Sequence, residues 1–103
     1  MSQDTKVRFP NYLFRLRRLR GYSQKQFAML VGLTSRNAVS YLEAGRRLPS
    51  LAVALTIEVV LGTKLSEIYP DLCGQLAHQA AARESRLPTR FSRHIRGRVH
   101  RKD

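Results

Sequence analysis

Gly32 separates two short helical patterns, and this arrangement constrains the fold of the chain more than any other feature. Ser23 precedes the first pattern, and Gln26 follows three residues later, as in a capping box at the start of a helix. The second pattern is predicted to run from about Arg36 to Glu43. Glycine readily adopts the backbone angles of a tight turn. The stretch therefore predicts a helix-turn-helix, in which one helix braces the other.

The apolar residues around Gly32 predict which sides of the two helices meet. Ala28 is small enough to let the helices approach each other closely. The spacing of the apolar positions is that of helices with one buried face. The residues expected to face inward are Phe27, Leu30, Val31, Leu33, Ala38, Val39 and Leu42.

Helical periodicity continues on both sides of this pair and predicts an all-α fold of five short helices. A first helix is expected from about Tyr12 until Gly21. A fourth, over residues 51–61, is apolar on most sides and is therefore expected to be largely buried. A short fifth helix near residues 65–69 is expected to be capped at Thr63, and a modest helix over 71–85 follows. The predicted organisation is a mobile N-terminus (1–10), a helix-turn-helix domain (11–70) and a C-terminal helix with a basic tail (71–103).

The net charge of +12, from 19 basic and 7 acidic residues, indicates a polyanionic partner such as nucleic acid or an anionic membrane surface. A basic protein that is merely soluble is the other interpretation. Cys73 is the single cysteine, so the chain forms no internal disulfide and no metal site of paired cysteines. No apolar run reaches about 18 residues, and no secretory signal is recognised. A cytoplasmic, nucleoid-associated location is expected.

Residues 16–69 resemble the phage repressor and Cro-like family, also called XRE-like. The resemblance is carried by the segments Leu16–Gln24, Phe27–Ala28, Val31–Leu33, Val39–Arg47, Pro49–Leu51 and Leu61–Gly62. It implies a five-helix domain that binds palindromic operators as a homodimer. It also implies that the second helix of the pair lies in the major groove, where base pairs present distinct patterns of donors and acceptors.

The resemblance further implies roles for individual side chains. Arginine can bond guanine through two atoms, and asparagine can do the same with adenine. The residues that match base-reading positions are Arg36, Asn37, Ser40 and Tyr41, the last two with the sugar-phosphate backbone as an alternative contact. The residues expected to contact phosphates are Gln24, Ser35, Arg46 and Arg47. Glu43 is expected to be structural, with Arg17 or Arg20 as its partner.

The chain has one residue more than the family pattern between Leu33 and Val39. If Ser35 belongs to the turn, Arg36 and Asn37 lead the recognition helix. If Ser35 belongs to the helix, Ser35 and Arg36 lead instead. The sequence leaves this register open.

The last fifth of the chain carries half of its charge, with eight basic residues against two acidic ones over residues 83–103. Apolar residues recur there every four positions, at Leu87, Phe91, Ile95 and Val99. Three interpretations remain open for this tail: a basic arm on DNA phosphates, an amphipathic segment that completes a dimer or docks on a partner protein, or a membrane-surface segment.

The function indicated is a sequence-specific transcription regulator of double-stranded DNA, expected to act as a repressor. The second hypothesis is an antitoxin that binds a toxin through residues 71–103 and represses its own operon. A third is sequence-neutral DNA packaging. No enzyme, cofactor or metal site is predicted, because no nucleophile–base pair, phosphate-binding glycine loop or metal-ligand spacing is recognised.

Overall fold

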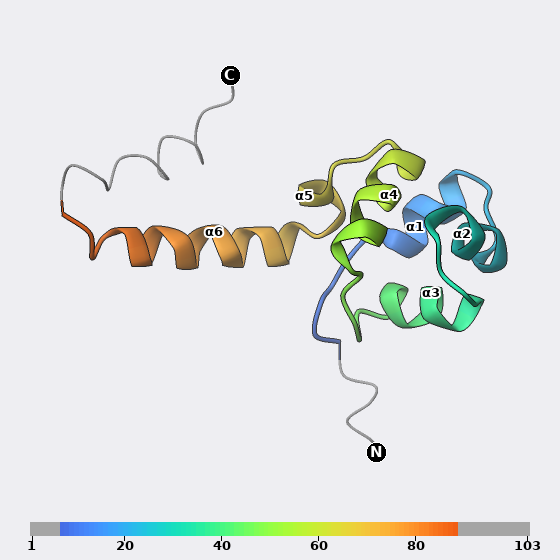
Figure 1. Cartoon of the computed structure of the whole chain (residues 1–103), viewed down its shortest axis with the longest axis horizontal. Helices are drawn as coiled ribbons and strands as arrows, with labels where there is room; N and C mark the ends of the chain where they lie inside the picture. Colours follow the sequence, from blue (N-terminus) through green and yellow to red (C-terminus); the bar gives the residue numbers. More distant parts are fainter. Residues whose placement is uncertain (1–6, 89–103) are drawn as a thin grey trace, which may run out of the picture. The chain divides into compact units, whose positions relative to one another are not determined.

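A computed structural model describes residues 7–88, and every regular element among them is a helix. The chain divides into two units, residues 1–71 and 72–103. Five helices belong to the first unit (Figure 1): α1 (Leu13–Leu19), α2 (Gln24–Val31), α3 (Arg36–Glu43), α4 (Leu51–Leu61) and α5 (Leu65–Ile68). A longer helix, α6 (Pro70–Glu84), supplies most of the described part of the second unit. The predicted all-α class with five short helices and a further C-terminal helix is confirmed.

The turn between α2 and α3 forms as the sequence predicts. Ser23 Oγ accepts a hydrogen bond from the backbone N–H of Gln26 at 3.0 Å, and the Gln26 side chain accepts one from the N–H of Ser23 at 2.8 Å. At the other end of α2, Gly32 has a φ of +85°, and the next N–H, of Leu33, donates to the carbonyl of Ala28 at 2.8 Å. Both ends of α2 are therefore fixed by local hydrogen bonds, which sets where α3 can begin.

The core of the first unit is assembled from all five helices. Its largest fully buried side chains are Leu13, Phe27, Val39, Ile57, Leu61 and Ile68. α2 contributes Phe27, Ala28 and Val31, whereas Leu30 remains 42% exposed. The inward prediction for Leu30 is wrong, because α2 packs along the line of Phe27, Ala28 and Val31 and Leu30 lies beside that line.

The expectation that α4 is largely buried is also wrong. Ala54, Ile57 and Leu61 are buried, but Leu51, Leu55 and Val59 are 73%, 51% and 79% exposed. These three residues are spaced four apart and therefore lie on one side of the helix. We call them the α4 row. A helix that is apolar on all sides carries no periodicity that would mark its open side.

The predicted helix ends hold with one exception. Ser50 caps α4 by accepting from the N–H of Val53, and Gly62 closes α4 in the left-handed conformation. The N-cap of α5 is Lys64 rather than the predicted Thr63. Thr63 donates its hydroxyl to the carbonyl of Leu61 at 3.1 Å, which removes it from the capping position.

The segment before α1 is held by hydrogen bonds where it is described. The N–H groups of Arg8 and Phe9 both donate to the carbonyl of Gly45, each at 2.9 Å. The side chain of Asn11 donates to the carbonyls of Phe9 and Leu42 and accepts from the N–H of Leu13. The last residues of the N-terminus predicted to be mobile are thus tied to α1 and α3, and residues 1–6 lie outside the described residues.

Among residues 7–88, no helix is both long and apolar enough to span a lipid bilayer. The same part of the chain contains no cluster of three His, Cys, Asp or Glu side chains arranged to hold a metal ion.

Candidate nucleic-acid interface

α3 presents one buried and one exposed face. Val39 and Leu42 are buried against the core. On a helix, residues 36, 37, 40 and 41 fall on the opposite side. That side is exposed except for a half-buried Tyr41. Its members are the four residues predicted to read bases, Arg36, Asn37, Ser40 and Tyr41.

Ser35 belongs to the turn. It is the N-cap of α3, with extended backbone angles (φ −153°, ψ 161°), and α3 begins at Arg36. The structure therefore resolves the register that the extra residue left open, and Arg36 and Asn37 lead the helix. The Ser35 side chain makes no capping hydrogen bond, and it is exposed. Its hydroxyl and the first N–H groups of α3 are available to an acceptor from outside the helix.

The loop after α3 brings two arginines onto one aromatic ring. The guanidinium carbons of Arg46 and Arg47 lie 4.9 Å and 4.7 Å from the centre of the Tyr41 ring. The backbone N–H of Arg46 also donates to the carbonyl of Tyr41 at 3.0 Å. Two residues predicted to contact phosphates are thus in direct contact with one predicted to read bases.

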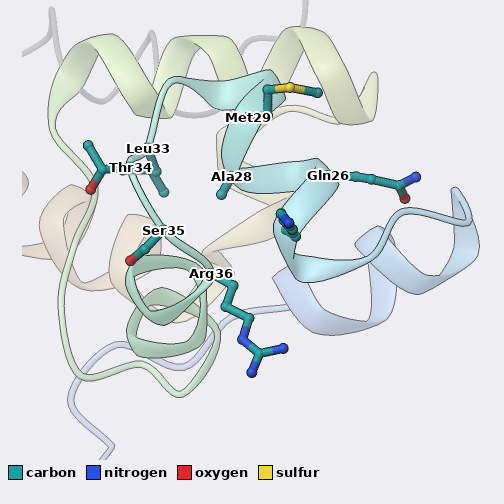
Figure 2. A pocket seen from close by; sticks show the side chains of 8 residues that line it. Gln26, Ala28, Met29, Leu33, Thr34, Ser35 and Arg36 are labelled. Atoms are coloured by element: carbon teal, nitrogen blue, oxygen red, sulfur yellow. The ribbon is translucent and has the colours of Figure 1, made fainter.

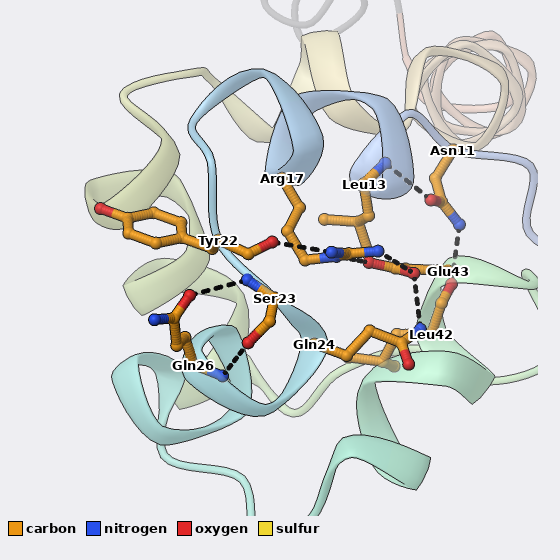
Figure 3. A network of polar contacts seen from close by, with 9 residues as sticks. All are labelled: Asn11, Leu13, Arg17, Tyr22, Ser23, Gln24, Gln26, Leu42 and Glu43. Atoms are coloured by element: carbon orange, nitrogen blue, oxygen red, sulfur yellow. Dashed lines mark hydrogen bonds and ion pairs between the residues drawn. The ribbon is translucent and has the colours of Figure 1, made fainter.

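A buried ion pair joins α3 to α1 (Figure 3). Arg17 bonds both carboxylate oxygens of Glu43, through Nε and through Nη2, the latter at 3.2 Å. Its Nη1 donates to the carbonyl of Tyr22 at 2.8 Å. Both charged side chains are only 6% exposed. The structural role predicted for Glu43 is confirmed with Arg17 as partner, whereas Arg20 donates to the carbonyl of Leu61.

Gln24, at the start of α2, is the third member of this network. Its Nε2 donates to Glu43 Oε1 at 3.0 Å, so the side chain is held close to the end of α3 (Figure 3). The second amide hydrogen and the backbone N–H at the helix start are not engaged by Glu43. The position is therefore compatible with the predicted phosphate contact.

A hollow of about 690 Å³ lies between α2 and the start of α3 (Figure 2). Ala28, Met29 and Leu33 give it an apolar lining. Two cationic residues, Lys25 and Arg36, also line it. Lys25 could not be recognised from the sequence, because an isolated lysine on an exposed helix carries no distinguishing signal. The polar cluster around Asn11 was not predictable either, because it depends on a hydrogen bond from Asn11 to the carbonyl of Leu42, 31 positions away.

The structure places all eight predicted site residues on adjoining elements: the start of α2, the turn, the outer face of α3 and the loop that follows it. It brings Arg46 and Arg47 into contact with the ring of Tyr41. Gln24 joins the group through Glu43. The basic tail predicted after Pro88, including Phe91, Ile95 and Val99, lies outside the described residues.

Comparison with known proteins agrees with this geometry. A family model described as "Helix-turn-helix" matches residues 13–68, which is more than half of the chain. No curated protein matches the chain.

Proposed function

The chain belongs to the XRE-like helix-turn-helix family of DNA-binding transcription regulators, and we propose that it acts as a repressor at a palindromic operator. The observation that carries the proposal is the outer face of α3. Its exposed side chains are hydrogen-bonding groups suited to base edges, while its apolar side chains are buried in the core. A rigid helix of this kind is what direct readout of the major groove requires.

In the proposed complex, Arg36 and Asn37 contact bases near the start of α3, and Ser40 and the Tyr41 hydroxyl contact the bases or sugars that follow. The phosphate contacts come from Gln24, Ser35, Arg46 and Arg47. These groups flank the outer face of α3 on two sides, so they are placed to fix its register on the duplex. Phosphate contacts position the protein, and base contacts supply the discrimination.

The α4 row supports the homodimer. Leu51, Leu55 and Val59 form an exposed apolar strip, and apolar strips of this kind mark interaction surfaces. α4 has no lysine or arginine, and Glu58 is its single ionisable side chain. Two copies that each carry a net charge of +12 repel each other over most of their surfaces. We propose that the neutral α4 row is where a second copy packs, and that the dimer places two recognition helices about 34 Å apart.

A second candidate function is that of an antitoxin whose C-terminal region binds a toxin. It is favoured by the division of the chain after Asp71 and by Leu76 on α6, which is 52% exposed. It predicts that the full-length chain binds the purified product of a short adjacent gene, and that Leu76→Glu abolishes this binding without changing DNA affinity. Equal binding by the variant would contradict the role assigned to α6.

The primary test is selection of bound duplexes from a random pool by the full-length protein, followed by sequencing. A repressor of this kind enriches a two-fold symmetric site with half-sites about one helical turn apart. Enrichment of an asymmetric site would contradict the symmetric dimer. Absence of enrichment at physiological salt would contradict sequence-specific binding and favour DNA packaging. Transcription in vitro from a promoter that carries the selected site then distinguishes repression from activation.

A further inference from the structure

Tyr41 contacts the loop that follows α3 in two ways. Its carbonyl accepts a hydrogen bond from the N–H of Arg46. Its ring lies within 5 Å of the guanidinium carbons of both Arg46 and Arg47, at 4.9 Å and 4.7 Å. A guanidinium at this distance from a ring centre is attracted by the electron-rich face of the ring. The ring therefore restrains two neighbouring cationic side chains that would otherwise rotate freely.

The described residues around these two arginines do not neutralise their charges. Neither Arg46 nor Arg47 forms an ion pair with another of residues 7–88. Both guanidinium groups lie near the same ring, within about 10 Å of each other. The two positive charges repel each other, and no carboxylate of the described residues pairs with either of them. Two restrained, unneutralised guanidinium groups are suited to bind anionic oxygens in a fixed geometry.

We propose that the Tyr41 ring positions Arg46 and Arg47 for contacts with DNA phosphates, so that Tyr41 is a positioning residue for the DNA backbone as well as a group on the reading face. The inference rests on the proposed DNA-binding function and deepens it. It separates two parts of one side chain: the hydroxyl, assigned above to bases or sugars, and the ring, assigned here to the two arginines. Each part can be removed without the other.

A restrained arginine loses less side-chain freedom on binding than an unrestrained one. The ring therefore contributes affinity for every DNA sequence equally, since phosphates are the same at each base pair. An exposed cation–π contact corresponds to roughly a two- to fivefold change in an equilibrium constant. Removal of the ring should weaken binding to cognate and random DNA by the same factor.

The test measures the affinity of the full-length protein for a short random-sequence duplex over a series of salt concentrations. Each phosphate contact contributes about 0.9 to the slope of log K against log salt. The variants are Tyr41→Phe, Tyr41→Leu, the double variant Arg46→Ala with Arg47→Ala, and the triple variant that adds Tyr41→Leu. Leucine retains apolar volume at this half-buried position but has no ring. Thermal unfolding followed by circular dichroism checks that each variant is folded.

Tyr41→Phe is expected to keep the wild-type slope, because the ring remains. Tyr41→Leu is expected to weaken binding by about two- to fivefold, with a smaller fall in slope than in the double arginine variant, because both arginines keep their charges. The triple variant is expected to match the double variant, because the ring acts through the arginines. Wild-type affinity for Tyr41→Leu, an equal loss of affinity for Tyr41→Phe, or an additional loss in the triple variant would each overturn the proposal.

A measurement without DNA keeps the inference testable if the leucine variant binds poorly for another reason. A ring beside a guanidinium shifts the NMR signals of the adjacent δ-methylene protons, so the signals of Arg46 and Arg47 should move in Tyr41→Leu and stay in Tyr41→Phe. Unchanged signals in both variants would overturn the contact itself. Failure of the proposed function would give a different result. The wild-type protein would bind random DNA as tightly as any selected site, while Tyr41→Leu would still bind more weakly than Tyr41→Phe.

Discussion

Arg17 and Glu43, 26 positions apart, form a buried ion pair that fastens the end of the recognition helix to α1. Each of the two side chains also forms a hydrogen bond with a third residue. Arg17 also reaches the carbonyl of Tyr22, and Glu43 also accepts from Gln24. The network therefore joins α1, α2 and the segment between them to α3, and it holds the start of α2 near the end of α3.

This relationship predicts a large cost for removal of one partner. Glu43→Gln leaves the Arg17 charge buried without a carboxylate, so the free energy of unfolding should fall by about 3–5 kcal/mol. Urea unfolding measures the change. Replacing both partners, with Arg17→Met and Glu43→Leu, should recover most of that loss because no unpaired charge remains. A double variant as unstable as the single one would show that the hydrogen bonds to Tyr22 and Gln24, rather than the buried charge, dominate.

Gly45 is predicted to resist substitution more strongly than another glycine with similar backbone angles. Its φ is +74°, and an added Cβ would lie 2.8 Å from the carbonyl oxygen of Phe9. Gly21 has a φ of +81° and nothing within 4 Å of an added Cβ. Gly21→Ala should cost about 1 kcal/mol from the left-handed conformation alone. Gly45→Ala should cost at least about 1 kcal/mol more, because backbone must move. Thermal and urea unfolding compare the two variants, and equal losses would contradict the steric argument.

The buried phenol of Tyr69 predicts that the free energy of unfolding falls at alkaline pH. Burial raises the pKa of its phenol to about 12. Its hydroxyl has no hydrogen-bond partner among the described residues. Below the ordinary value of about 10, the phenol is neutral in both folded and unfolded chains, and its burial adds no pH dependence. Between pH 10 and 12 the unfolded phenol ionises while the folded one resists, so stability is lost as the pH rises.

Tyr69→Phe isolates this effect. The variant should lose less stability than wild type between pH 10 and 12, as measured by urea unfolding at a series of pH values. At neutral pH it should be equal to wild type or up to about 1 kcal/mol more stable, because a buried unpaired hydroxyl is removed. Tyr12→Phe, at a position 49% exposed, is the control. A variant that follows the wild-type alkaline curve would show that Tyr69 does not account for the loss.

The α4 row predicts the oligomeric state. Leu55→Glu places a charge in the middle of the row. The dimer association constant should fall by at least about tenfold, because dimerisation would bury an unpaired charge. Sedimentation equilibrium of the full-length chain measures it. Leu19→Glu, at an exposed apolar position of α1, is the matched control and should leave the dimer intact. If Leu76→Glu on α6 disrupts the dimer and Leu55→Glu does not, the interface lies in the second unit.

Arg36 is predicted to discriminate between base pairs. Arg36→Ala should cost about 1–3 kcal/mol on the selected site and relax the preference at one base pair of each half-site. Arg15→Ala removes the same charge from an exposed position of α1. It should change the affinities for selected and random duplexes equally. Competition binding with selected and random duplexes provides the measurement, and equal losses for Arg36→Ala on both would exclude base reading.

The local part of this fold was predictable from the sequence because its signals are local. The capping box of Ser23 and Gln26, the left-handed turn at Gly32 and the bounds of α3 each depend on a few neighbouring residues. The choice of Arg17 over Arg20 as the partner of Glu43 was not predictable. Both arginines lie on or just after α1, and only the packing of α1 against α3 distinguishes them.

The contact of Tyr41 with Arg46 and Arg47 was hidden for a related reason. The contact requires the chain to reverse direction at Gly45, which has a positive φ. This reversal brings the side chains of Arg46 and Arg47 back to the Tyr41 ring. A list of basic residues in a loop carries no information about that reversal. The open side of α4 was hidden because its apolar residues surround the helix, so that no sequence period separates the core side from the row of Leu51, Leu55 and Val59.

The two hydrogen bonds from Arg8 and Phe9 to the carbonyl of Gly45 have a practical consequence for handling the protein. They hold this segment beside the junction of α3 and the loop that carries Arg46 and Arg47. In the proposed complex, a bulky partner fused directly ahead of Val7 would begin at that junction and would compete with the duplex for space. Purification handles and fluorophores for binding measurements are therefore better attached elsewhere than directly ahead of Val7.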